Sequence, residues 1–142
     1  MPTTMLQPYL TAISVSNVDT LADWYRRILS FTHRKRMEFP EYELRIVFME
    51  RDGFLLELVE KRKSASLTTR LPDLEDDVFV WGFKKLAFLV GDACEFAASL
   101  KAAGVKILFD VTEQEDWPGG KTKSFIIEDP DGNWIQFYEK CP

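Results

Sequence analysis

The sequence predicts an α+β fold made of two tandem copies of one module, in which a strand and a helix are followed by three more strands (βαβββ). Short runs of alternating apolar residues indicate the strands, and two stretches with apolar residues at helical spacing indicate the helices. Turn signals at residues 51–53 and 129–132 separate neighbouring strands. The same order of elements occurs twice in 142 residues, and the whole chain, residues 1–142, suits one compact domain.

The first module is expected at residues 9–60. Its strand, its helix and its three further strands are predicted at residues 10–16, 20–29, 34–39, 43–50 and 54–60. Asn17 or Asp19 can cap the helix, because either side chain can accept hydrogen bonds from amides of the first turn. The helix carries a single apolar stripe, formed by Leu21, Trp24, Tyr25 and Ile28.

Residues 61–82 interrupt this pattern and are expected to form a linker between the modules. They contain a basic run at residues 61–63, Pro72 and an acidic run at residues 73–77. These charges suit a solvated surface, and a docking element for another protein is the alternative.

The second module is expected at residues 83–140. Its four strands are predicted at residues 85–90, 105–109, 123–128 and 133–139. Asp92 can cap a helix that runs to Ala103, and Gly104 ends this helix. A loop is expected around residues 117–120, where Pro and Gly are adjacent.

The two modules can be aligned with one another by eye. Residues 10–15 lie over residues 85–90, and residues 55–58 lie over residues 134–137. In both modules a capping residue follows two positions after the valine that ends the first strand. A single unit of one helix and four strands cannot bury both its helix and its sheet well. Two units are therefore expected to pair, within one chain or between chains.

Composition limits the classes of partner. The formal net charge of −5 and the pI of about 5.0 disfavour nucleic acid as the main partner. No apolar run approaches the roughly 20 residues that cross a bilayer, and the first residues lack a secretory signal, so we expect no membrane partner and a cytoplasmic protein. Cys94 and Cys141 lack metal-type spacing and are expected to be free thiols, with a disulfide as the alternative.

Several motifs, taken in order and duplicated, point to one family. They lie at residues 13–19 leading into 24–29, at residues 54–59, at residues 86–90 and above all at residues 125–139, which include the sequence Asp-Pro-Asp-Gly. Over residues 9–140 the chain resembles the vicinal oxygen chelate superfamily of glyoxalase I, extradiol dioxygenases, methylmalonyl-CoA epimerase and the bleomycin and fosfomycin resistance proteins. This resemblance implies a curved, cup-like mixed sheet with helices on the outer face, often completed as a homodimer.

The resemblance also maps the family's metal-ligand positions, which lie on the first and last strands of each module. They fall on Leu10, Glu57, Lys85 and Gln136. Leu10 has no donor atom, and the ammonium of Lys85 only donates hydrogen bonds, which leaves Glu57 and the weak donor Gln136. This set is poor for a divalent ion, so neither a metal nor another cofactor is expected.

Glu57 and Lys85 are the candidate catalytic residues. Glu57 and Gln136 each lie between apolar neighbours on a strand, so both are expected to point away from the helix-facing layer. A salt bridge between Glu57 and Lys85 that only fills the vacated site is one interpretation. The functional alternative is that Lys85 holds an anionic ligand or that Glu57 acts as a base.

Alternation predicts Ser14, Trp134 and Tyr138 on the inner face with the mapped positions, and Phe48 is expected as an aromatic wall from the first module. The candidate substrate-binding residues are Leu10, Ser14, Phe48, Trp117, Phe125, Trp134, Gln136 and Tyr138. Trp117 and Phe125 are expected at a rim or lid beside the glycine-containing loop. This mainly apolar set suits a flat or aromatic organic ligand, and the alternative for any aromatic residue is a core or dimer-interface role.

The leading hypothesis is a metal-independent protein that binds a small organic molecule, in the manner of the bleomycin-resistance proteins. The alternative is an enzyme, a lyase or isomerase that resembles lactoylglutathione lyase or an epimerase and uses Glu57 or Lys85, with or without a divalent metal. A regulatory or structural dimer with a silent pocket is the third hypothesis. Fold resemblance alone supplies no substrate.

Overall fold

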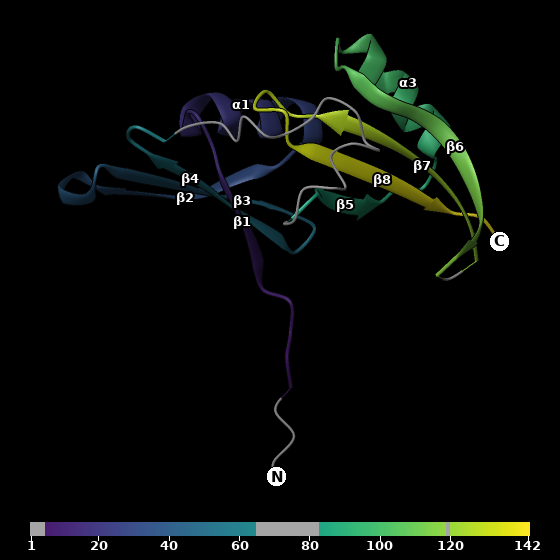
Figure 1. The fold of residues 1–142 in the computed structure, drawn as a ribbon, viewed down its shortest axis with the longest axis horizontal. Coiled ribbons are helices and arrows are strands. Elements are labelled where there is room, and N and C mark those ends of the chain that lie inside the picture. Colours follow the sequence, from purple (N-terminus) through teal and green to yellow (C-terminus); the bar gives the residue numbers. More distant parts are fainter. Residues whose placement is uncertain (1–4, 65–82, 119) are drawn as a thin grey trace. The chain divides into compact units, whose positions relative to one another are not determined.

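The computed structural model describes residues 5–64, 83–118 and 120–142 (Figure 1). The chain divides into two compact units, Met1–Ser66 and Leu67–Pro142. Most of the expected linker, residues 65–82, lies outside the described residues. In the described part of each unit, one α-helix packs on one face of a four-stranded sheet.

The first unit has the predicted order of a strand, a helix and three strands. Its elements are β1 (Leu10–Ser14), α1 (Val18–Leu29), β2 (Thr32–Phe39), the 3-10 turn η1 (Pro40–Tyr42), β3 (Leu44–Arg51) and β4 (Phe54–Lys61). The sheet order is β1-β4-β3-β2, with β1 parallel to β4 and the other pairs antiparallel. The last strand of the module is therefore an inner strand, next to the first.

The second unit repeats this topology. Its elements are β5 (Lys85–Leu89), α3 (Ala93–Ala102), β6 (Ile107–Trp117), β7 (Gly120–Glu128) and β8 (Trp134–Lys140). The sheet order is β5-β8-β7-β6, and β5 runs parallel to β8. The α+β class and the two βαβββ modules are thus confirmed.

Strand register confirms the internal alignment of the two modules. Ala12 of β1 is opposite Glu57 of β4, and Ala87 of β5 is opposite Gln136 of β8. These are the pairs that the sequence alignment of the modules relates to each other. Glu57 and Gln136 therefore occupy equivalent positions in the two sheets.

In the first unit, α1 and the sheet bury one shared apolar layer. The helix contributes Val18, Leu21, Tyr25 and Leu29, and the sheet contributes Val47, Met49, Leu56 and Leu58. Trp24 and Ile28, expected in the centre of the helical stripe, lie partly exposed beside it. The buried stripe is thus shifted around the helix from the predicted one.

In the second unit, aromatic side chains dominate the helix-facing layer. Phe125 of β7 and Phe137 of β8 have ring centroids 5.1 Å apart. Phe96 of α3 packs edge-on against Phe137, with ring centroids 4.9 Å apart. Edge-to-face pairs of this kind are favourable beyond their buried area, so they hold α3 on this face of the sheet.

The two helices begin in the same way. The side chain of Asn17 accepts hydrogen bonds from the amides of Asp19 and Thr20, and Asp92 accepts one from Glu95 N. The predicted caps are thus confirmed. Of the two candidates for the first helix, Asn17 is the cap.

The structure differs most from expectation in the region before β7. A strand was predicted only over residues 105–109, whereas β6 extends to Trp117 and β7 begins at Gly120. The added part of β6 is polar, so it lacks the apolar alternation that indicates a strand. It is stabilised by pairing with β7 and by ion pairs such as Lys121 Nζ to Glu113 Oε2 at 3.0 Å.

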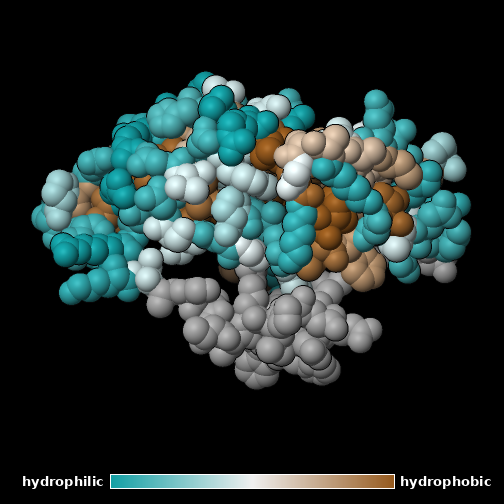
Figure 2. All heavy atoms as spheres, turned by 90° about the horizontal axis from the view of Figure 1, so that it is seen from above, coloured by the Kyte–Doolittle hydropathy of each residue, from teal (hydrophilic) through white to brown (hydrophobic). Residues whose placement is uncertain are grey.

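Surface chemistry agrees with these amphipathic layers. In the view of Figure 2, most of the coloured surface is hydrophilic, and hydrophobic atoms gather in a limited area. No helix among residues 5–64, 83–118 and 120–142 has the length and apolar character needed to span a bilayer.

Candidate functional site

The face of each sheet that lies opposite its helix carries the candidate residues. Leu56 and Leu58 are fully buried under α1, and Glu57 between them points to the other face and is partly exposed. Ile135 and Phe137 are buried on the α3 side in the same way, so Gln136 lies on the open side of its sheet. The predicted alternation of these strands is confirmed.

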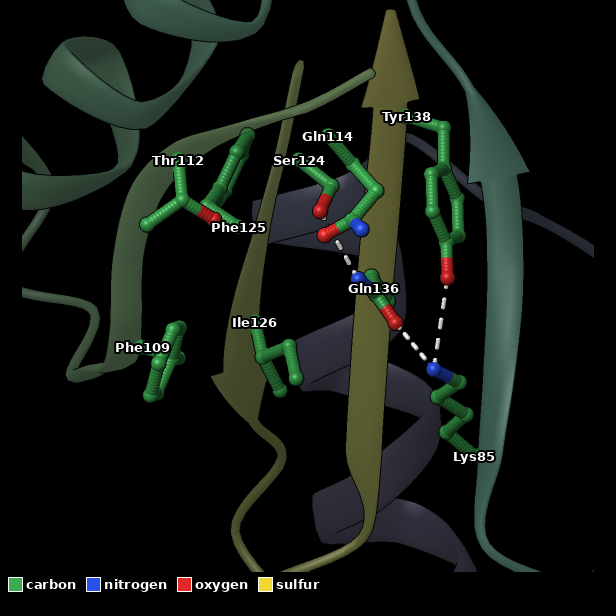
Figure 3. Close-up of a pocket in the computed structure, with 9 residues that line it drawn as sticks. All are labelled: Lys85, Phe109, Thr112, Gln114, Ser124, Phe125, Ile126, Gln136 and Tyr138. Carbon is green, nitrogen blue, oxygen red and sulfur yellow. Dashed lines mark hydrogen bonds between the residues drawn. The ribbon is translucent and has the colours of Figure 1, made fainter. Parts of the chain in front are cut away.

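The open face of the second sheet contains a hollow of about 230 Å³ (Figure 3). All four strands of this sheet contribute to it. Its lining residues are Lys85, Phe109, Thr112, Gln114, Ser124, Phe125, Ile126, Gln136 and Tyr138. The hollow lies entirely within one unit, so its geometry is set by the register of a single sheet.

A chain of hydrogen bonds crosses the floor of this hollow, as the dashed lines of Figure 3 show. Lys85 Nζ donates to Gln136 Oε1, and Gln136 Nε2 donates to Ser124 Oγ at 2.9 Å. Lys85 Nζ also donates to the Tyr138 hydroxyl at 3.3 Å and lies 5.8 Å from the centre of that ring. The chain thus connects β5, β8 and β7 through polar side chains.

Within its own unit, Lys85 is a cation with neutral partners. The ion pairs of the described residues 83–118 and 120–142 involve Lys101, Lys106 and Lys121, and none of them involves Lys85. The oxygens that accept from Lys85 belong to an amide and a phenol. Among the described residues of this unit, no carboxylate therefore neutralises its positive charge. The expected salt bridge with Glu57 joins residues of different units and stays a prediction.

The four mapped ligand positions do not suit a divalent metal ion. Leu10 offers no donor atom, and the amide oxygen of Gln136 accepts from Lys85. An ammonium at this oxygen takes one of its two lone pairs and places a positive charge beside it, which disfavours a second cation there. In the described parts of the chain, no three His, Cys, Asp or Glu side chains are grouped as a metal site requires.

Three predicted residues lie on the open face of the first sheet. Leu10 is opposite Leu55, Ser14 is opposite Val59, and Phe48 is opposite Glu57. All three share the side of the sheet that carries Glu57, as alternation predicted for Leu10 and Ser14. Whether any of them contacts a ligand stays a prediction.

The aromatic candidates of the second unit have different surroundings. Tyr138 lines the hollow, whereas Trp134 is buried on the same face of β8 without lining it. Phe125 lies inside β7 and is 0% exposed, with its ring against Phe137 and Phe96, so the expectation that it forms a rim or lid is wrong. Trp117 ends β6 opposite Gly120, in a strand pair rather than in the expected loop.

Sequence reasoning missed several lining residues. Ser124 and Ile126 belong to β7 and pair with Tyr138 and Gln136, so the alternation of β7 could have identified them. Phe109 was placed in a strand but not on the open face. The remaining two, Thr112 and Gln114, lie in the polar part of β6, which the sequence did not indicate as a strand.

The sequence comparisons agree with this architecture. The model of the family described as the glyoxalase/bleomycin resistance protein/dioxygenase superfamily matches residues 8–137. A lactoylglutathione lyase of Neisseria meningitidis (serogroup A) is 28% identical over 134 residues, which cover 92% of this chain and 88% of that protein.

Solved structures show the same fold. A glyoxalase family protein from Enterococcus faecalis superposes with a TM-score of 0.74 at 22% identity, covering 94% of this chain and 97% of that chain. The trypanothione-dependent glyoxalase I of Leishmania major gives a TM-score of 0.68 at 20% identity, covering 96% and 88%. With its duplicated βαβββ topology and a family match over nearly its whole length, the chain belongs to the glyoxalase/bleomycin resistance protein/dioxygenase superfamily.

Proposed function

We propose that this protein binds a small organic molecule, without a metal ion, in the hollow on the open face of β5–β8. The observation that carries the proposal is the ammonium of Lys85, which has neutral partners in a hollow that is also lined by Phe109, Phe125 and Ile126. Sites for small molecules combine apolar walls with a few convergent polar groups. A volume of about 230 Å³ suits a compact ligand or one part of a larger ligand.

Metal independence is supported by the chemistry of the mapped positions. A divalent ion needs oxygen, nitrogen or sulfur lone pairs, and Leu10 and Lys85 supply none. Glu57 alone keeps a strong donor at these positions. Binding is therefore proposed to depend on the side chains of the protein.

The alternative is a lyase or isomerase in which Glu57 moves a proton and Lys85 stabilises negative charge on the substrate. It is favoured by the 28% identity to a lactoylglutathione lyase over 92% of the chain. A carboxylate within reach of the substrate can serve as a general base, and an ammonium can stabilise a developing oxyanion. This alternative requires Glu57 and Lys85 to face one ligand.

Two measurements separate these functions. Metal analysis of the purified protein is expected to show no stoichiometric Ni, Zn, Mn or Fe, and one equivalent of any of them would contradict metal-independent binding. An assay for lactoylglutathione formation or breakdown is expected to show no turnover. Turnover that is lost in Glu57→Gln would establish the enzymatic alternative instead.

A thermal-shift screen tests binding itself, because a ligand that prefers the native state raises the apparent stability. The screen uses aromatic compounds, bleomycin, acyl-CoA esters and glutathione adducts. Hits are then measured with Lys85→Met and Glu57→Gln. The matched control is Lys140→Met, which removes a charge from the same sheet at an exposed position outside the hollow. If both site variants fold and bind as the wild type does, the site is wrongly assigned.

We further infer a cytoplasmic homodimer, which the family resemblance supports. Sedimentation velocity at micromolar concentration is expected to give the mass of two chains, against 16.5 kDa for one. A single species with the mass of one chain would contradict the dimer.

A further inference from the structure

The hydrogen-bond chain on the floor of the hollow has a fixed direction. The ammonium of Lys85 can only donate, so the Gln136 group that faces it must be the amide oxygen. The amide nitrogen of Gln136 consequently points to the opposite side, where it donates to Ser124 Oγ. Lys85 thus determines the orientation of the amide between the two residues.

This direction determines what Ser124 can offer to a ligand. Its oxygen accepts from Gln136 Nε2, so its own hydrogen is directed to a different acceptor. The Lys85 ammonium carries three hydrogens, and two of them are directed to Gln136 and Tyr138. Lys85 and Ser124 both line the hollow, and among the described residues nothing accepts the third hydrogen of Lys85 or the hydroxyl hydrogen of Ser124.

We propose that the hollow selects ligands that carry a carboxylate, which receives hydrogen bonds from Lys85 and Ser124, over ligands that carry a neutral amide. This inference rests on the proposed function and names the chemical class of its ligand. A carboxylate only accepts hydrogen bonds, so it matches the two donors Lys85 and Ser124. One ammonium balances one negative charge, which favours a singly charged group over a phosphate dianion.

The remaining walls define the body of the ligand. Ile126 of β7 is buried beside Gln136, and Phe109 of β6 is 47% exposed at the hollow. These side chains offer apolar contact to a short hydrocarbon or a single ring. The proposed ligand is therefore a compact apolar or aromatic carboxylic acid.

Matched pairs of probes test the inference. Phenylacetate is compared with phenylacetamide, and 2-naphthylacetate with 2-naphthylacetamide, by isothermal titration at pH 7. In each pair the bodies are the same and the head groups differ in charge and in donors. The wild type is expected to bind each carboxylate roughly 10- to 100-fold more tightly than its amide, as for hydrogen bonds to a charged group.

Three variants identify the donors, with circular dichroism to verify folding. Ser124→Ala is expected to weaken carboxylate binding about 3- to 10-fold, and Lys85→Met to remove the preference for the carboxylate. Gln136→Glu keeps the size of the side chain but provides acceptors at both ends, so Ser124 is expected to donate to it. The preference for the carboxylate should then disappear while amide binding persists. Thr32→Val, which removes an exposed hydroxyl outside the hollow, is the control and should retain the preference.

The outcomes distinguish this inference from the proposed function. If no carboxylate or amide of either pair binds, the hollow is not a site for small molecules and both proposals are overturned. If the probes bind but the carboxylates have no advantage, or Ser124→Ala retains it in full, only the inference is overturned. Preference in the wild type that depends on Lys85 and Ser124 supports both.

Discussion

Glu139, near the end of β8, accepts a hydrogen bond from the backbone nitrogen of Ala93, the first residue of α3, at 2.8 Å. The first unit repeats this contact, because Glu60 of β4 accepts from the backbone nitrogen of Val18, the first residue of α1, at 2.8 Å. In each module the last strand thus anchors the start of the helix. A carboxylate at this place is favoured by the unpaired amides and by the helix dipole.

Removing this anchor should lower stability. Glu139→Ala is expected to reduce the free energy of unfolding by about 1–3 kcal/mol, because it leaves a partly buried amide without its charged acceptor. Glu139→Gln keeps an acceptor oxygen and should cost less. Urea denaturation followed by circular dichroism measures both. Glu41→Gln, on the exposed turn η1, is the charge control, and an equal loss there would contradict a specific role for Glu139.

The carboxylate of Asp129 organises the turn between β7 and β8. Its Oδ1 accepts from the amides of Asp131 and Asn133, at 3.0 and 2.9 Å, and its Oδ2 accepts from Asn133 Nδ2 at 2.8 Å. Asp129→Ala should destabilise the protein by about 2–4 kcal/mol, since the residue is buried and three donors lose their acceptor. Asp129→Asn should be intermediate, because it retains one acceptor oxygen. Equal stability of all three proteins in urea would show that the turn is held by its backbone alone.

Replacing Thr122 of β7 is not expected to lower the free energy of unfolding, unlike the two changes above. Its hydroxyl is buried, and among the described residues it has no hydrogen-bond partner. Thr122→Val should therefore be neutral or raise the free energy of unfolding by up to about 1 kcal/mol, because valine has nearly the same shape and suits a strand. Thermal unfolding by calorimetry measures the change. Thr112→Val is the exposed control, and a marked loss of stability in Thr122→Val alone would reveal a partner for this hydroxyl.

The ion pairs of α1 predict a dependence of stability on pH. Arg27 and Arg26 donate hydrogen bonds to Asp23, each at 2.7 Å, and hold the pKa of this carboxyl below its ordinary value of 3.8. Because the folded-state pKa is the lower one, the contribution to stability is present above pH 4 and is lost as the pH falls through the folded-state pKa. Asp23→Asn should thus be slightly less stable than the wild type at pH 7, and the difference should shrink as the pH falls below 4. Urea titrations across this range measure it, and a constant difference would contradict the linkage.

The sequence predicted the modules because their core strands follow simple alternation. Leu56, Glu57 and Leu58 show the pattern clearly, and the pairing of Ala12 with Glu57 and of Ala87 with Gln136 follows from the duplication. Alternation also predicted which face carries these two polar residues.

The floor of the hollow was only partly predictable. The direction of its hydrogen-bond chain depends on the contact of Gln136 in β8 with Ser124 in β7. Such a contact between strands can be predicted only when the register of the strands is known. The polar part of β6 was missed for a related reason. Its strand conformation depends on pairing with β7, and neither the propensity nor the alternation of its own residues indicates it.

The parallel pairing of the first and last strands of each module has a consequence for folding kinetics. Leu10 is opposite Leu55 in the parallel register, and Lys85 is opposite Trp134. Each first strand therefore cannot pair with its neighbour until nearly the whole module has been synthesised. Local hairpins can form early, whereas this closing contact spans a long loop and carries its entropy cost. A nascent chain that stops before β8 therefore leaves β5 without its neighbour in the sheet, and the unit is complete only once β8 has left the ribosome.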